Sequence, residues 1–142
     1  MLLTRAEIAA RIPHGEPMCM LDAVVSYDET TIECLSYQFA HASHPLDATH
    51  QIAPELLIEY SAQAAALHAS LNQKGLGSAR PAYLGAIKEI ELIAPVLENQ
   101  TPLTISAECL LSSGHGAIYT VEVKQAEQIK MTGRLLLNQP EN

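Results

Sequence analysis

The sequence is poor in basic and aromatic residues. Its 8 Lys and Arg stand against 16 Asp and Glu, so the 142-residue chain has a net charge of −8 at pH 7. This balance argues against a nucleic-acid-binding protein, which needs a basic surface for phosphate contacts. With no Trp, 1 Phe and 5 Tyr, the core must be built mainly from aliphatic side chains and alanine. Apolar residues still make up 48% of the chain, which excludes wholesale disorder.

The chain also lacks paired cysteines and long apolar runs. Cys19, Cys34 and Cys109 are far apart without metal-ligand or redox spacing, so we expect buried free thiols in a reducing compartment. The N-terminus becomes charged too early for a signal peptide. The most apolar stretch, residues 56–71, contains polar side chains and is too short for a membrane span. We therefore expect a cytoplasmic protein without a membrane span.

The length fits one domain covering residues 1–142, and no repeat or linker divides it. Thr4 and Glu7 have the spacing of a capping box, which predicts a short helix over residues 4–11. Pro54 suits the first position of a second helix, predicted over about residues 54–73 and ending before Gly75. This second helix is apolar nearly all round, as is typical of a helix buried at the centre of a domain.

Alternating apolar and polar residues predict an antiparallel sheet with one solvated face. Leu111 and Ile129 belong by this alternation to the apolar sets of their strands. A sheet wrapped around one central helix is the α+β hotdog fold, and another α+β sandwich is the alternative. The predicted strands are residues 18–27, 31–39, 83–93, 103–111, 117–124 and 129–137.

Glu59 is the first candidate for chemistry, because it lies one turn inside the apolar helix. Gln63 follows one turn later on the same face. A carboxyl in such surroundings favours its protonated form and can act as a general acid. The alternative interpretation is structural, with Glu55, Glu59 and Gln63 forming a solvated stripe on one exposed side of the helix.

Three histidines, His41, His44 and His50, lie in the polar loop over residues 40–53. A neutral imidazole is a ready general base near physiological pH, but residue chemistry does not select one of the three. Their spacing is not that of a compact metal site, so we expect no metal and no cofactor. His68 and His115 are interpreted as an ordinary helix-face residue and a turn residue.

Three segments together resemble the bacterial 3-hydroxyacyl-(acyl carrier protein) dehydratases of the hotdog fold. The first, Ile12-Pro13-His14-Gly15-Glu16-Pro17-Met18-Cys19-Met20-Leu21-Asp22, is similar to the family's opening motif. The second combines His44-Pro45-Leu46 with Leu56-Leu57-Ile58-Glu59 and Ala62-Gln63, and the third is Leu84-Gly85-Ala86-Ile87-Lys88 leading to Ala94-Pro95-Val96. The His-Pro-Leu sequence most resembles the subgroup linked to aryl-polyene lipid synthesis.

The resemblance implies a dehydration of 3-hydroxyacyl thioesters carried by an acyl carrier protein or CoA. His44 would remove the α-proton and Glu59 would protonate the departing hydroxyl. Because the family takes these two residues from different protomers, it implies a homodimer with its active site at the interface. The substrate-binding residues would be Glu55, Gln63, Leu84, Gly85 and Ala86.

The sequence departs from the family pattern in two places. Ala53-Pro54 stands where the family has Pro-Gly, and proline lacks the backbone N–H that the glycine donates to the thioester. Glu91, Ile93 and Ala94 replace basic residues of the usual carrier-protein dock. Two other functions therefore stay open: an acyl-thioester hydrolase in which Glu59 activates water, or a catalytically silent hotdog subunit that binds acyl chains.

Overall fold

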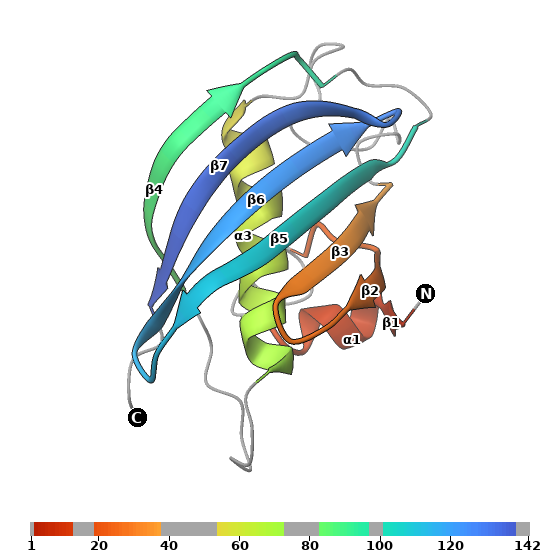
Figure 1. Ribbon diagram of the computed structural model, residues 1–142. Coiled ribbons are helices and arrows are strands. Elements are labelled where there is room, and N and C mark those ends of the chain that lie inside the picture. Colours follow the sequence, from red (N-terminus) through yellow and green to blue (C-terminus); the bar gives the residue numbers. More distant parts are fainter. Residues whose placement is uncertain (1, 13–18, 38–53, 73–82, 97–100, 139–142) are drawn as a thin grey trace.

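The computed structural model describes residues 2–12, 19–37, 54–72, 83–96 and 101–138. Within them, one antiparallel sheet of seven strands curves around a single long helix, α3 (Figure 1). The strand order is β1-β2-β3-β5-β6-β7-β4, so β1 and β4 form the two edges. The strands are β1 Leu3–Thr4, β2 Ala23–Tyr27, β3 Thr31–Ser36, β4 Tyr83–Leu92, β5 Leu103–Ser112, β6 Gly116–Gln125 and β7 Gln128–Asn138.

The short helix α1, Arg5–Ala9, begins where the capping box predicts. The Thr4 side chain accepts a hydrogen bond from the Glu7 backbone N–H, and the Glu7 side chain accepts one from the Thr4 backbone N–H. These two bonds satisfy donors that a helix start leaves without partners. The helix ends at Ala9, two residues before the predicted end.

The central helix α3 spans Pro54–Leu71, which confirms the predicted start and places the end slightly before residue 73. Pro54 fits the first turn because its missing N–H would have no partner within the helix. The helix packs against the concave face of the sheet, chiefly along β5, β6 and β3. Twelve of its 18 residues are buried, polar ones included, and this all-round burial explains its lack of a solvated side.

The inner face of the sheet supplies the other half of the core. Every second residue is buried along β6, and the buried residues of β5 and β7 keep the same alternation over part of each strand, as predicted. The prediction is wrong for Leu111, which is 63% exposed, and for Ile129, which is 39% exposed. Both lie at strand ends beside a shift in register, between Cys109 and Leu111 on β5 and between Val123 and Lys124 on β6.

The edge strand β4 is fixed to β7 by a bulge. The register shifts between Lys88 and Glu91, and Glu89 adopts a left-handed backbone with φ of 54°. Ile90 lies directly over Gly133 of β7, where a Cβ atom would overlap its Cδ1. Gly133 therefore leaves room for Ile90 of β4 to pack against the core.

The predicted first long strand is shorter than its pattern indicates. Residues 19–22 are not part of the ladder, and β2 begins only at Ala23. The backbone N–H groups here bond elsewhere, because that of Met20 donates to the Gln63 side chain and that of Asp22 to the Leu35 carbonyl. This segment therefore links the sheet to the central helix.

The three cysteines are free thiols, as predicted. Cys19 and Cys34 are buried, and burial raises the pKa of Cys34 to about 12. Cys109 is only partly buried, so the expectation of burial is wrong for this residue. In the described part of the chain, no helix combines the length and apolar character that a membrane crossing requires.

Candidate active site

Glu59 lies in the second turn of α3 with its side chain partly buried, whereas Glu55, one turn earlier, is exposed. Glu59 Oε1 accepts a hydrogen bond from Gln63 Nε2 at 3.3 Å. Because the two residues are four positions apart on one helix, α3 itself brings them together. The structure thus pairs two of the side chains that the sequence selects.

Gln63 is fully buried, with 0% of its surface exposed. Its Oε1 accepts a hydrogen bond from the Met20 backbone N–H at 2.8 Å. Because a backbone N–H can only donate, this bond identifies the amide oxygen and directs Nε2 toward Glu59. The interpretation of Glu55, Glu59 and Gln63 as one solvated stripe is therefore wrong, since its third member is in the core.

The remaining predicted site residues are spread over other parts of the chain. His44 lies outside the described residues, as do His41 and His50, so the choice of base stays a prediction. Leu84, Gly85 and Ala86 lie on the edge strand β4, where Leu84 is 41% exposed. Within the described ranges, no cluster of three His, Cys, Asp or Glu side chains is placed to hold a metal ion.

His68 is a buried polar residue that the sequence interpretation missed. It is 1% exposed, with Nδ1 at 2.6 Å from the Tyr119 hydroxyl and Nε2 at 2.9 Å from the Asp28 backbone carbonyl. The structure places His68 on a face of α3, as interpreted, but the sequence interpretation did not predict that this face is buried. Tyr119 offered the signal: it occupies an inward position on its strand, where its hydroxyl needs a partner.

These contacts assign the state of the His68 ring. The carbonyl of Asp28 can only accept, so this contact requires a hydrogen on Nε2, and Nδ1 then accepts from Tyr119. The Asn72 side-chain amide also lies beside Nε2, with Nδ2 2.7 Å away, and it matches the same ring state when its oxygen occupies that position. Burial lowers the pKa of His68, and burial likewise raises the pKa of Tyr119. Both shifts favour a neutral imidazole and a protonated phenol. The two contacts of the His68 ring connect α3 to β6 and to the turn before β3.

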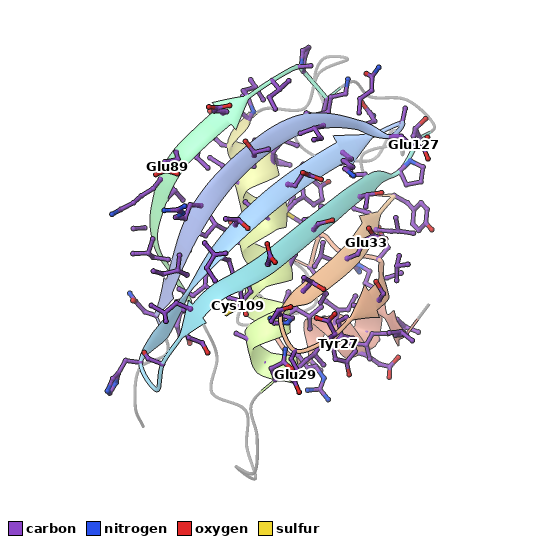
Figure 2. The ribbon with its side chains drawn as sticks, in the orientation of Figure 1. Tyr27, Glu29, Glu33, Glu89, Cys109 and Glu127 are labelled. Atoms are coloured by element: carbon purple, nitrogen blue, oxygen red, sulfur yellow. The ribbon has the colours of Figure 1, made fainter. Side chains whose placement is uncertain are left out.

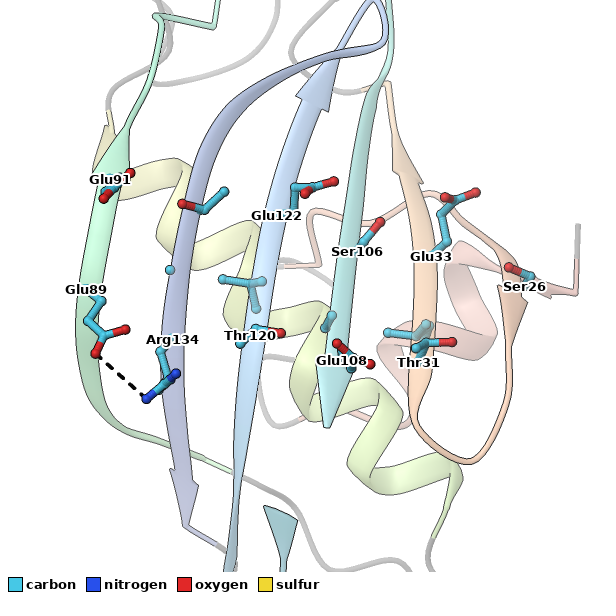
Figure 3. A pocket seen from close by; sticks show the side chains of 15 residues that line it. Ser26, Thr31, Glu33, Glu89, Glu91, Ser106, Glu108, Thr120, Glu122 and Arg134 are labelled. Carbon is cyan, nitrogen blue, oxygen red and sulfur yellow. Dashed lines mark ion pairs between the residues drawn. The ribbon is translucent and has the colours of Figure 1, made fainter. Parts of the chain in front are cut away.

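A broad groove of about 660 Å³ lies on the outer face of the sheet, away from α3 (Figure 3). Five carboxylates line it, with one arginine among them, and two of the five, Glu33 and Glu89, also stand out in Figure 2. Arg134 Nη1 lies 3.8 Å from Glu89 Oε1. The sheet separates this groove from the helix that carries Glu59, so the groove is not part of the candidate active site. Its acidic residues are Glu33, Glu89, Glu91, Glu108 and Glu122.

An antiparallel sheet curved around one central helix places the chain among the hotdog-fold proteins, and solved structures agree. The dehydratase heterocomplex ApeI:P from Xenorhabdus doucetiae matches with a TM-score of 0.78 at 20% identity, over 95% of this chain and 91% of that chain. A thioesterase from Haemophilus influenzae matches with a TM-score of 0.70 at 13% identity, over 97% and 91%. A Streptococcus mutans protein bound to acetyl CoA matches with a TM-score of 0.66 at 11% identity, over 84% and 88%.

Comparison of nearly the whole sequence with models of protein families identifies the family. The model of the ApeP-like family, described as ApeP dehydratase, matches residues 6–142. The chain belongs to the ApeP-like dehydratase family, and it is a hotdog-fold dehydratase, an enzyme of the lyase class. This confirms the dehydratase resemblance drawn from the three sequence segments. None of the curated protein sequences matches the chain.

Proposed function

We propose that the enzyme dehydrates 3-hydroxyacyl thioesters, with His44 as general base and Glu59 as general acid. The observation that carries this proposal is the Glu59 carboxyl, partly buried on the central helix and contacted by a fully buried glutamine. A carboxyl in such surroundings tends to keep its proton, which a general acid requires. The imidazole would supply the complementary neutral base.

The two residues would divide the reaction between them. His44 takes the proton from the carbon next to the thioester carbonyl, and the electrons of that C–H bond form the double bond. The bond between C3 and the hydroxyl oxygen breaks as Glu59 gives that oxygen its proton, so water leaves. The enzyme then holds an imidazolium and a carboxylate, and proton transfer between them through solvent restores the starting state.

The start of α3 would bind the thioester carbonyl. Backbone N–H groups in a first helical turn have no partner within the helix, and the helix dipole favours negative charge there. Pro54 provides no N–H, so the first available donor is the backbone N–H of Glu55. Leu84, Gly85 and Ala86 on β4 complete the predicted substrate-binding set.

The substrate would arrive on an acyl carrier protein or on CoA, in the synthesis of fatty-acid-like or aryl-polyene lipids in the cytoplasm. The family assignment supports the acyl chemistry. The carrier would have to accept an enzyme with a net charge of −8, so a local cationic patch is the expected contact for an acidic carrier. Lys88 on β4 is a candidate, whereas Arg134 opposite it on β7 is opposed by the groove carboxylates and lies near Glu89.

A homodimer would form along β4. This edge strand leaves backbone groups that a second copy can pair. Four apolar side chains on β4 and a fifth directly after it are exposed, and a partner would cover them. Those residues are Tyr83, Leu84, Ile87, Leu92 and Ile93, each between 41% and 55% exposed. Size measurement by light scattering tests the dimer, and a monomer at micromolar concentration would remove both the dimer and a shared active site.

A catalytically silent subunit is the second candidate, favoured by the missing N–H at Pro54. One matching structure is a heterocomplex of two dehydratase components, which supports pairing with a different, active chain. Mixing the protein with a separate hotdog dehydratase would reveal this role, since activity would then depend on the partner's catalytic residues and survive Glu59→Gln.

Turnover of the purified protein tests the main proposal. Incubation with 3-hydroxyacyl and enoyl thioesters, followed by the absorbance of the conjugated enoyl group, reports dehydration and hydration. We expect His44→Ala and Glu59→Gln each to lower kcat by roughly 10²- to 10⁴-fold, the usual contribution of a general acid or base. His41→Ala and His50→Ala should have milder effects.

Ser70→Ala is a matched control for the helix, because Ser70 is 5% exposed on α3 and its hydroxyl has no partner among the described residues. We expect it to keep wild-type turnover. Full activity in Glu59→Gln would contradict the acid role, and release of free thiol without enoyl formation would indicate a hydrolase instead.

A further inference from the structure

We propose that Gln63 is a positioning residue that selects which oxygen of Glu59 presents the acidic proton to the substrate. This inference rests on the proposed role of Glu59 as general acid. It gives Gln63 a different task from the direct substrate contact that the family resemblance implies.

Gln63 belongs to a chain of hydrogen bonds that runs from the sheet to Glu59. Ser36 Oγ on β3 donates to the Met20 carbonyl at 2.6 Å, and the Met20 N–H donates to Gln63 Oε1 at 2.8 Å. Gln63 Nε2 then donates to Glu59 Oε1 at 3.3 Å. Ser36 and Gln63 are both 0% exposed, so the first links of this chain are held within the core.

The direction of these bonds carries the argument. The Met20 N–H can only donate, so it occupies the amide oxygen and leaves the amide nitrogen as the group that meets Glu59. A protonated carboxyl has one hydroxyl and one carbonyl oxygen, and the carbonyl oxygen is the better acceptor. A fixed donor at Oε1 therefore makes Oε1 the carbonyl oxygen and places the proton on Oε2, where it can be transferred.

Burial separates positioning from substrate contact. A side chain that is 0% exposed with its oxygen bonded to the backbone is held by the fold before any substrate arrives. A general acid gains from this, because its proton must be held in the right direction when the hydroxyl departs. The other titratable groups on the elements that meet here are Glu55, Tyr60 and His68 on α3, Cys19 and Asp22 before β2, and Glu33 and Cys34 on β3, with His44 as the predicted base.

Two substitutions separate the two hydrogen bonds of the Gln63 amide, one with Met20 and one with Glu59. Gln63→Glu keeps an oxygen for the Met20 N–H and replaces the fixed amide donor toward Glu59 by a second carboxyl, so that the two carboxyls share a proton. Gln63→Leu removes both hydrogen bonds with little change in volume. Ser70→Ala, a buried polar change on the same helix outside this chain of bonds, is the control.

Enzyme kinetics as a function of pH give the first readout. The rate should fall at high pH as Glu59 loses its proton. Loss of a donor to the carboxylate raises the Glu59 pKa, and a neighbouring carboxylate raises it further. Both variants should therefore move the alkaline limb of the kcat profile to higher pH, with the larger shift in Gln63→Glu. At the optimum kcat should fall by about 10- to 100-fold, with KM changed by less than about threefold.

Ser70→Ala should leave the alkaline limb in place. An unchanged kcat and an unchanged limb in both Gln63 variants would overturn the proposal. A raised KM with kcat and limb unchanged would also overturn it, in favour of direct substrate contact. A purely structural role for Gln63 would lower the folded fraction without moving the limb, and this too would contradict positioning.

A second readout does not depend on turnover. NMR titration of isotope-labelled glutamate carboxyl carbons, with Glu59→Gln to assign the signal, gives the titration midpoint of Glu59 in each protein. We expect the midpoint to rise in both Gln63 variants and to stay constant in Ser70→Ala. An unchanged midpoint in the Gln63 variants would disprove the contact, whereas full turnover by Glu59→Gln would disprove the proposed function and leave the midpoints to decide the contact.

Discussion

Glu59 and Gln63 in the first part of α3 (Pro54–Gln63, here called its first half) and His68 in the second part (Ala64–Leu71, here called its second half) are bonded in different ways. In the second half, His68 is 1% exposed and each ring nitrogen has a partner, one a tyrosine hydroxyl and the other a backbone carbonyl. In the first half, Glu59 is only partly buried and a fully buried Gln63 contacts one of its oxygens. A polar group that is fully buried and bonded within the core serves the fold, whereas a carboxyl that is partly exposed can meet a substrate.

The hydropathy of the sequence does not distinguish these halves, because both have the pattern of an apolar helix with occasional polar residues. The difference lies in the elements that face them. His68 forms hydrogen bonds with β6 and with the turn before β3. Gln63 forms one with the irregular segment before β2, which is not part of the sheet. Substitutions in each half should therefore separate stability from turnover, and the following predictions test that separation.

The largest effect on stability is expected in the second half. His68→Ala removes the acceptor of the Tyr119 hydroxyl and the donor to the Asp28 carbonyl, and it leaves a cavity. We expect a loss of about 2–4 kcal/mol in the free energy of unfolding, with kcat per folded molecule unchanged. Chemical denaturation and kinetics check both. A loss of turnover without a loss of stability would contradict the structural role assigned to His68.

Pro54→Gly should have the opposite profile in the first half. Glycine restores a backbone N–H at the helix start, where one donor to a bound carbonyl is worth roughly a hundredfold in rate. We expect turnover to rise, by up to that factor, and the free energy of unfolding to fall by about 1 kcal/mol or less because glycine enlarges the unfolded ensemble. Thermal melts and kinetics on the pair decide it. Unchanged or lower turnover would mean that the carbonyl finds its donor elsewhere.

The smallest expected effect is a pH dependence of stability from His68. Burial lowers its pKa below the ordinary value of 6.5, so below that pH the unfolded chain binds more protons than the folded one. The stability from the neutral ring is complete above about pH 6.5 and is lost as the pH falls toward the folded pKa.

Unfolding free energies of wild type and His68→Gln, measured at several pH values, test this dependence. The difference between them should shrink below pH 6.5 by at most about 1.4 kcal/mol per pH unit. The other histidines are present in both proteins and cancel. A constant difference across this range would show that His68 is not held neutral.

Local patterns predict most of the fold. Thr4 and Glu7 locate the start of α1, and Pro54 locates the start of α3. The alternation of apolar and polar residues locates the strands in the C-terminal half of the chain. The pattern fails where the chain leaves regular pairing. Leu111 follows a register shift that alternation does not encode, and residues 19–22 have apolar character but bond outside the ladder.

The candidate site was only partly predictable, for a similar reason. Glu59 is conspicuous because a carboxyl is costly in an apolar helix, and its spacing to Gln63 indicates their contact. Burial of Gln63 depends on Met20, 43 residues away in the sequence, and that of His68 depends on Tyr119, 51 residues away. Helix periodicity carries no information on such partners, since Met20 lies in an irregular segment before β2 and Tyr119 lies on a distant strand.

The acidic groove on the outer face of the sheet limits how copies of this enzyme can assemble. Two sheets stacked through this face would bring together the five groove carboxylates of each copy, with only one arginine per groove to oppose them. Desolvating like charges at such short range opposes stacking, and added salt weakens this opposition because it screens charge. This opposition fits the proposed dimer, in which two copies meet along the β4 edge and the acidic faces stay apart.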